Sequence, residues 1–255
     1  MRTIMNTPIL VFLLTFIVMW VSALIGAAAR KSKGDLGADS RDDLGLILGA
    51  TLTLLGLIIG FTFSMAVSRY DQRKNYEEAE ANAIGTEFVR ADLLPLTDAA
   101  KVRTLLRSYL DQRILFYDNR DAAQLKQINA TTAQLQDELW NAVRVPAAAQ
   151  PTPVAAVVLV GMNDVLNSQG YTQAAWWNRI PIAAWGLMIA ISICSNGLVG
   201  YYSYHIQAKA PLSLILPLVL GISFFLIADI DSPRGGVIRV KAQNLVALSG
   251  SMHPN

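Results

Sequence analysis

Four long stretches without a charged side chain constrain this chain more than any other feature. Residues 3–29, 44–68, 180–208 and 210–228 contain no Asp, Glu, Lys or Arg. A helix that crosses the bilayer core, about 30 Å thick, needs about 20 apolar residues, and each stretch is about that long or longer. Only 16% of the 255 residues are charged, whereas an average soluble domain carries about 25%. The pattern predicts a polytopic helical membrane protein and argues against a soluble globular protein, a disordered chain or a secreted disulfide scaffold.

These stretches define four predicted membrane spans, at about residues 8–29, 44–68, 180–204 and 211–230. The first could instead be a signal peptide, because the three alanines at its end resemble a cleavage site. The apolar core of a signal peptide is usually about 7–15 residues long. The run seen here is longer and ends in a basic cluster, so we favour a retained first span.

Most of the charge lies between two pairs of spans. Residues 70–178 hold 23 of the 40 charged residues. We predict an N-terminal transmembrane hairpin over residues 1–69, a helical domain over 70–178, a C-terminal transmembrane pair over 179–230 and a tail over 231–255. With four spans, both termini and the helical domain share one side of the membrane. That side has eight Lys and Arg near helix ends and the other side has five, so the positive-inside rule predicts that it is cytoplasmic.

The charged domain has a helical period throughout. A helix rich in Glu and Ala is predicted over residues 71–94, and Thr97 is predicted to cap a helix that ends near Asp118. The next helix is predicted to end before Pro146, and a further one covers about residues 154–168. Its apolar run VAAVVLV is too short to span a membrane, so we predict that it is packed core. With no strand pattern, the fold class is predicted to be all-α.

No sequence motif in the chain indicates catalysis. It contains no HExxH, no GxSxG, no Walker loop and no GxGxxG after a strand. The two histidines, His205 and His253, are far apart, and His205 follows tyrosines typical of a membrane interface. The single cysteine, Cys194, excludes an internal disulfide and a multi-cysteine metal site. We therefore expect no enzyme, no cofactor and no metal site.

The charges do not indicate a nucleic-acid partner either. The formal net charge is only +2, which is too small to indicate one. Three carboxylates, Glu77, Glu78 and Glu80, cluster after the second span and alternate with alanines. Such a run is typical of a solvated helix face, and that is our prediction for it.

The second span carries a stripe of glycines. At about 100° per residue, its four glycines fall within about 60° of one another on the helix. They are Gly45, Gly49, Gly56 and Gly60. In a bilayer, small residues let helix backbones approach closely, so we predict that this stripe packs against another helix.

Beside the glycines lies a second sector, at about 80–160°, that combines small hydroxyls with two large apolar side chains. It contains Thr53, Leu57, Phe61, Ser64 and Ser68. One interpretation is an ordinary helix–helix contact. The other is the lining of an aqueous pathway, in which Leu57 and Phe61 form a constriction that gates by dewetting. Four helices of one chain cannot enclose such a pore around one helix, so the second interpretation requires a closed ring of subunits.

The sequence LIIGFTFSMAVSRYD at residues 57–71 resembles the second transmembrane segment of bestrophins. Gly60, Phe61, Ser68 and Arg69 match that segment position by position, as does the tyrosine that follows. The chain is more closely similar to the bacterial bestrophin-like family of unknown function. The recurrent phrases of that family are found here as GFTFSMAVSRYDQR, EAEANAIGTEFVRADLLP and DIDSPRGGVIRV.

The resemblance carries expectations about the pore. Bestrophins are pentameric ion channels whose second helices form an apolar neck, and by position the neck corresponds to Thr53, Leu57 and Phe61, with Ser64 and Ser68 lining the pore beyond it. Thr53 places a hydroxyl where an apolar ring is expected, which implies a wetter neck. The acidic calcium-binding run of animal bestrophins is missing after the last span, where only Asp229 and Asp231 stand. We therefore do not expect calcium gating.

The polar residues of the family phrases have simpler interpretations. The run Ser232-Pro233-Arg234-Gly235-Gly236 predicts a sharp turn at the membrane surface, with positive φ at the paired glycines and Arg234 paired to Asp231. Three further polar residues are predicted to tie helices or subunits together rather than to bind ions. They are Glu80, Asn82 and Arg90.

The sequence thus predicts a homo-oligomeric, bestrophin-like ion channel of the bacterial inner membrane, whose partners are the lipid bilayer, copies of itself and permeant inorganic ions. The alternative is a non-conducting membrane scaffold or sensor that acts through residues 70–178. A secondary transporter is disfavoured because the spans lack buried ionisable residues and an inverted repeat.

Overall fold

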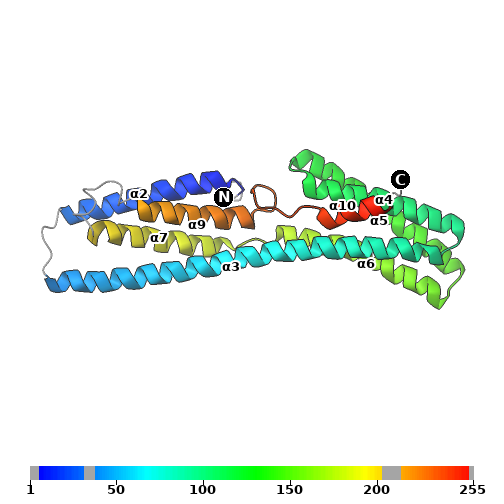
Figure 1. Ribbon diagram of the computed structural model, residues 1–255, viewed down its shortest axis with the longest axis horizontal. Helices are drawn as coiled ribbons and strands as arrows, with labels where there is room; N and C mark the ends of the chain where they lie inside the picture. Colours follow the sequence, from blue (N-terminus) through cyan, green and yellow to red (C-terminus); the bar gives the residue numbers. More distant parts are fainter. Residues whose placement is uncertain (1–5, 32–37, 203–213, 253–255) are drawn as a thin grey trace. The chain divides into compact units, whose positions relative to one another are not determined.

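The protein is built from helices throughout the part of the chain that the computed structural model describes, residues 6–31, 38–202 and 214–252. Figure 1 shows the order of these elements along the chain. They are α2 (Pro8–Lys31), α3 (Ala38–Arg90), the 3-10 helix η1 (Ala91–Leu93), α4 (Leu96–Asp118), α5 (Ala122–Ala149), α6 (Pro153–Trp177), α7 (Ile182–Tyr202), α9 (Ile215–Asp231) and α10 (Gln243–Met252). The prediction of an all-α fold is confirmed. The two histidines lie outside the described residues.

The chain divides into two compact units. The first comprises Met1–Arg69 and Arg179–Arg239, and the second comprises Tyr70–Asn178 and Val240–Asn255. Within the described residues, three segments are long and apolar enough to cross a membrane. They are Pro8–Lys31, Ser40–Leu93 and Pro153–Tyr202, the last of which contains α6 and α7. The predicted fourth span coincides with α9, which has 17 described residues.

In the first unit, α2 packs along both α7 and α9. Glycines permit the closest of these approaches. A Cβ atom built on Gly26 of α2 would overlap the carbonyl oxygen of Gly197 on α7, and one built on Gly200 of α7 would overlap the carbonyl oxygen of Ala23 on α2. The two backbones therefore touch directly, as small residues allow in a bilayer.

The long helix α3 joins the two units without a break. Its 53 residues far exceed the roughly 20 that a bilayer requires. The second predicted span and the predicted helix over 71–94 are therefore one helix, because no proline, glycine or turn residue interrupts the sequence between them. The α-helix ends at Arg90, and η1 leads into Pro95, which disfavours helical backbone in the residue before it.

The second unit has a continuous apolar core formed by α3, α4, α5, α6 and α10. Its fully buried members include Ile84, Leu106, Tyr109, Leu139, Val143, Met162, Val165 and Leu245. The predicted end of α4 at Asp118 is confirmed. The predicted cap was wrong: Pro95 takes the N-cap position of α4, so Thr97 already lies inside the helix.

Two further expectations for this unit were wrong. Helix α5 does not stop before Pro146 but continues to Ala149, so the proline lies inside the helix, in its last turns. The run VAAVVLV was predicted to be packed core, yet only Val158 in it is fully buried. Three of its other valines are exposed, namely Val154, Val157 and Val160.

The short helix α10 is held in the second unit at both of its ends. Both N-terminal amides, of Asn244 and Leu245, donate to one carboxylate oxygen of Glu77 on α3, at 2.9 and 3.0 Å. At the other end, Arg107 of α4 donates from Nε to the carbonyl oxygen of Met252, at 3.0 Å. A carboxylate at the N-terminus and a guanidinium at the C-terminus both complement the helix dipole. The predicted tail therefore contributes a helix to this unit.

We predict that Gly200→Ala destabilises the first unit, because the added methyl group overlaps the α2 backbone. Overpacking of this kind typically costs about 1–3 kcal/mol. The matched control is Gly186→Ala on the same helix, where a Cβ meets no described atom within 4 Å. Thermal unfolding in detergent should show a lower Tm for Gly200→Ala only. Equal Tm values for the two variants would contradict the close α2–α7 contact.

Candidate pore-lining face of α3

The membrane half of α3 is left almost uncovered by its own chain. Only 6% of the most apolar part of this helix is buried, against 28% for α2. In residues 44–68, which are all described, the buried side chains are Leu55, Thr62 and Ala66. Leu55 packs with Met19 and Leu220 from α2 and α9. One narrow stripe of α3 thus faces its own subunit.

The sector predicted from sequence as pore lining lies on the opposite side of α3. At about 100° per residue, the centre of that sector is about 160° from the buried stripe. Leu57 is 52% exposed and Phe61 is 63% exposed. The other three members are exposed too, namely Thr53, Ser64 and Ser68. A single chain therefore presents all five side chains outward.

The glycine stripe also lies away from the other helices of the chain. Cβ atoms built on Gly49, Gly56 and Gly60 would meet no described atom within 4 Å. At Gly45 the nearest contact would be the hydroxyl oxygen of Tyr202, at 3.5 Å. A helix that packs closely on this stripe would therefore have to come from another chain.

The hydroxyl of Thr53 is bound to its own helix. Its Oγ1 donates to the carbonyl oxygen of Gly49, at 2.9 Å. The hydrogen is thus used internally, while the oxygen keeps a lone pair that can accept a bond from water. Thr53, Leu57 and Phe61 follow one another at four-residue steps, about 6 Å apart along the axis.

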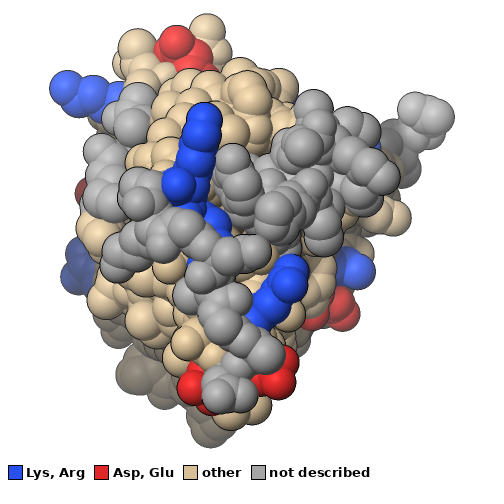
Figure 2. All heavy atoms as spheres, turned by 90° about the vertical axis from the view of Figure 1, so that its left-hand side faces the viewer, with Lys and Arg blue, Asp and Glu red and all other residues tan. Residues whose placement is uncertain are grey.

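Charges of both signs stand at the N-terminal end of α3. Arg41, Asp42 and Asp43 are adjacent and exposed. Figure 2 views this end of the first unit, and both basic and acidic side chains appear on it. A mixed set of charges does not create a field of one sign, so it indicates no preference for anions or cations.

The two carboxylates in the last turn of α9 are engaged by protein donors. Asp229 accepts the backbone amides of Val237 and Ile238, each at 2.8 Å. Asp231 accepts the backbone amide of Ile180 at 3.0 Å and Nε of Arg179 at 3.2 Å. All four carboxylate oxygens therefore anchor the turn and the start of α7. The described residues contain no cluster of three His, Cys, Asp or Glu that could hold a metal ion.

The turn after α9 uses its glycines for space rather than for unusual dihedral angles. Neither Gly235 nor Gly236 has positive φ, so that prediction was wrong. A Cβ on Gly235 would overlap the carbonyl oxygen of Asn6, and one on Gly236 would overlap that of Asp229. The turn begins at Ser232, whose Oγ accepts the amide of Gly235 at 3.0 Å. Pro233 and Arg234 lie within it, both half-buried.

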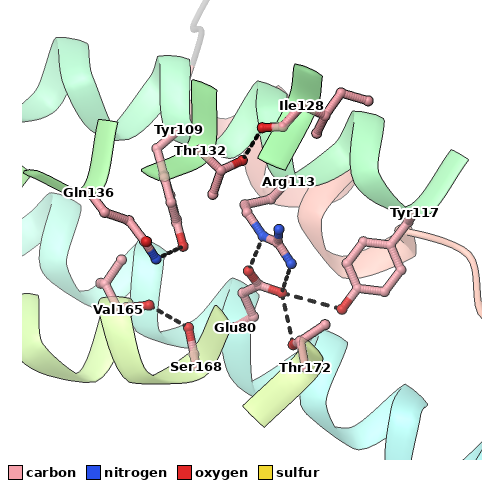
Figure 3. A network of polar contacts seen from close by, with 10 residues as sticks. All are labelled: Glu80, Tyr109, Arg113, Tyr117, Ile128, Thr132, Gln136, Val165, Ser168 and Thr172. Carbon is pink, nitrogen blue, oxygen red and sulfur yellow. Dashed lines mark hydrogen bonds and ion pairs between the residues drawn. The ribbon is translucent and has the colours of Figure 1, made fainter. Parts of the chain in front are cut away.

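In the second unit, α3 contributes a buried carboxylate to a polar network, shown in Figure 3. Glu80 and Arg113 are both fully buried and form an ion pair. The second carboxylate oxygen of Glu80 accepts hydrogen bonds from the hydroxyls of Tyr117 at 3.3 Å and Thr172 at 3.1 Å. Glu80 therefore joins α3 to α4 and α6. Asn82 is exposed and Arg90 is half-buried.

The electrostatics of this network follow from burial and from the charge of Glu80. Burial disfavours the charged form of Arg113, but attraction to Glu80 outweighs burial and raises the pKa of the guanidinium. Burial raises the pKa of the Tyr117 hydroxyl, and the negative Glu80 raises it further. The guanidinium of Arg113 thus stays charged, and the tyrosine stays a hydrogen-bond donor.

The predicted solvated face was wrong for two of its three carboxylates. Glu77 and Glu80 are buried, and only Glu78 is exposed. Their partners come from distant parts of the chain. One signal was available in the sequence: Arg113 stands four residues from both Tyr109 and Tyr117, on the apolar side of α4.

A family model of the Bestrophin-like domain matches residues 9–245. The chain belongs to the Bestrophin-like family. The match covers both units, so the resemblance seen in the second span and in the recurrent phrases is confirmed.

Solved structures share the fold of this Bestrophin-like protein. A bacterial bestrophin homologue from Klebsiella pneumoniae is 15% identical, with 96% of this chain and 99% of that chain covered and a TM-score of 0.63. A single-substitution variant of that homologue is 12% identical, with coverage of 94% and 97% and a TM-score of 0.65. A membrane protein with a glycine-to-alanine substitution is 15% identical, with coverage of 96% and 99% and a TM-score of 0.65. No curated protein matches the chain.

We predict that Glu80→Gln and Arg113→Met each destabilise the Bestrophin-like protein by about 3–5 kcal/mol, because each leaves a buried charge without its partner. The double variant should lose less than the sum of the two single losses, because it removes both charges. Glu78→Gln, on the exposed side of α3, is the matched control. Thermal unfolding in detergent measures all four, and additive losses would contradict a direct pairing.

Proposed function

We propose that this Bestrophin-like protein is one subunit of a homo-oligomeric ion channel of the bacterial inner membrane. In this proposal the chain crosses the membrane four times, through α2, the first half of α3, α7 and the segment that contains α9. Both termini and the helical domain face the cytoplasm. By resemblance to bestrophins the ring has five subunits, and α3 of each subunit lines a central pore.

The uncovered membrane half of α3 is the observation that supports this proposal most strongly. Lipid can cover large apolar side chains, but it gains little from a surface of glycines and hydroxyls. On α3 these small and polar residues occupy the side away from the helices of its own chain. Copies of α3 around an axis would give both sectors a role: the glycines would pack against the neighbour, and the hydroxyl sector would face water.

The neck of this proposed pore is formed by Phe61, Leu57 and Thr53 in three successive turns. Apolar rings of Leu57 and Phe61 exclude water unless the pore widens, so they act as a gate. Thr53 offers an oxygen acceptor to water, because its hydrogen is bound to Gly49. Such a neck controls conduction without selecting the sign of the ion.

The exposed valines of α6 are consistent with packing between subunits in the second unit. Val154, Val157 and Val160 form a stripe at three-residue steps and are 45–59% exposed. In the proposed ring this stripe packs against the neighbouring subunit. The ring requires no enzymatic activity, no cofactor and no nucleic acid; its partners are the bilayer, its own copies and inorganic ions.

We predict that Leu57→Ala and Phe61→Ala raise ion flux, because each removes part of the apolar constriction. If either change lowers the barrier by about 1.4 kcal/mol, the flux rises about tenfold. The measurement is ion flux from proteoliposomes that contain the purified protein. The matched control is Leu13→Ala on α2, a leucine of similar exposure, which should leave the flux unchanged. Unchanged flux in both α3 variants would remove these residues from the neck.

Cysteine labelling distinguishes the channel from the non-conducting scaffold. In a Cys194→Ser background, single cysteines at Thr53, Leu57, Phe61 and Ser64 are exposed to a water-soluble thiol reagent in membranes. A water-filled pore predicts labelling at these positions and protection at Leu55, on the buried stripe. Uniform protection would favour the scaffold, and it would count against the channel.

A further inference from the structure

Glu87 of α3 is a buried carboxylate to which no function has yet been assigned. Its side chain is fully buried in the second unit. Neither carboxylate oxygen has a hydrogen-bond donor among the described residues. Glu77 and Glu80, on the same helix, differ from it, because donors from α10, α4 and α6 satisfy their oxygens.

The carboxyl group of Glu87 is pressed against α6. A Cβ atom built on Gly161 would overlap Oε2 of Glu87 and the guanidinium of Arg90. The contact therefore has no room for a water molecule between the carboxyl group and the α6 backbone. An ionised carboxylate could be hydrated only if α3 and α6 moved apart, whereas the protonated carboxyl fits the space as it stands.

Two charged groups act on Glu87 from the helices that pack there. Arg90 lies on its own helix and attracts the ionised form, and Asp164 lies on α6 and repels it. Burial is the largest effect and raises the pKa of Glu87 from its ordinary 4.5 to about 8, with Arg90 lowering it and Asp164 raising it.

We propose that Glu87 is a proton-binding site that keeps the α3–α6 contact closed while it is protonated and loosens the contact when it ionises. This site is independent of ion conduction, because it rests on the packing within the second unit alone. It makes the C-terminal end of α3 responsive to pH.

Infrared spectroscopy of the full-length protein in detergent tests proton binding directly. A protonated carboxyl has a carbonyl absorption that a carboxylate lacks, so the spectrum of wild type minus that of Glu87→Gln should contain this band. The band should disappear as the pH rises, with a midpoint of about 8. Glu78→Gln, at an exposed position of α3, should leave the band in place. Identical wild-type and Glu87→Gln spectra throughout the titration would overturn the proposal.

Two variants keep the test valid if Glu87→Gln does not fold. Asp164→Asn removes the repelling charge and should move the midpoint to lower pH. Arg90→Gln removes the attracting charge and should move it to higher pH. Midpoints that do not shift in these opposite directions would assign the band to another carboxyl and overturn the site.

Stability and hydrogen exchange test the effect on the α3–α6 contact. Because folding raises the pKa of Glu87, the folded protein holds the proton more tightly than the unfolded chain does. This stabilisation is complete below pH 4.5 and is lost as the pH rises through about 8. The Tm of wild type should therefore fall over this range more than that of Glu87→Gln. In wild type, backbone amides around Gly161 should exchange hydrogen faster than in Glu87→Gln only at pH values above the midpoint. Equal exchange rates above the midpoint would overturn the link between ionisation of Glu87 and loosening of the α3–α6 contact.

Discussion

The structure depends on one long helix that has to satisfy two different surroundings. The membrane half of α3 is apolar and touches its own chain along the narrow stripe that contains Leu55. The other half packs against the second unit on one side, where it buries the carboxylates Glu77, Glu80 and Glu87, and leaves Glu78 and Asn82 exposed on the other. Within the second unit, Glu77 and Glu80 fix this half of α3 to α10, α4 and α6. In the proposed channel, copies of α3 from other subunits pack around the surface of α3 that its own chain leaves exposed.

The carboxylates of this protein serve to hold helices together. Glu77 caps α10, Glu80 pairs with Arg113, and Asp229 and Asp231 bind the amides of the turn and the start of α7. Each of these four groups is satisfied by donors from elsewhere in the fold, so none is available as a ligand unless a protein contact breaks. Glu87 is different, since no described donor reaches its oxygens, and for that reason it is the carboxylate we assign to proton binding.

The sequence was informative where local chemistry decides the structure. Charge-free runs located the apolar helices, and the end of α4 at Asp118 followed from its pattern. Predictions failed where distant partners decide. Glu77 and Glu80 looked solvated because their partners lie 167 and 33 residues away. The valine run of α6 looked like core because an apolar run does not by itself show which of its side chains the rest of the chain covers. For Gly235 and Gly236, the sequence did not show the need for space, because it comes from the backbones of Asn6 and Asp229 in the folded chain.

In the proposed channel, copies of α3 surround a shared axis with Thr53, Leu57 and Phe61 turned toward it. An image of the purified protein in nanodiscs, viewed down its symmetry axis, tests this most directly. The proposed channel predicts a closed ring, with five subunits, in which the side chains of Phe61 converge on a central opening. A monomeric particle, or a ring in which Phe61 points into lipid, would contradict it.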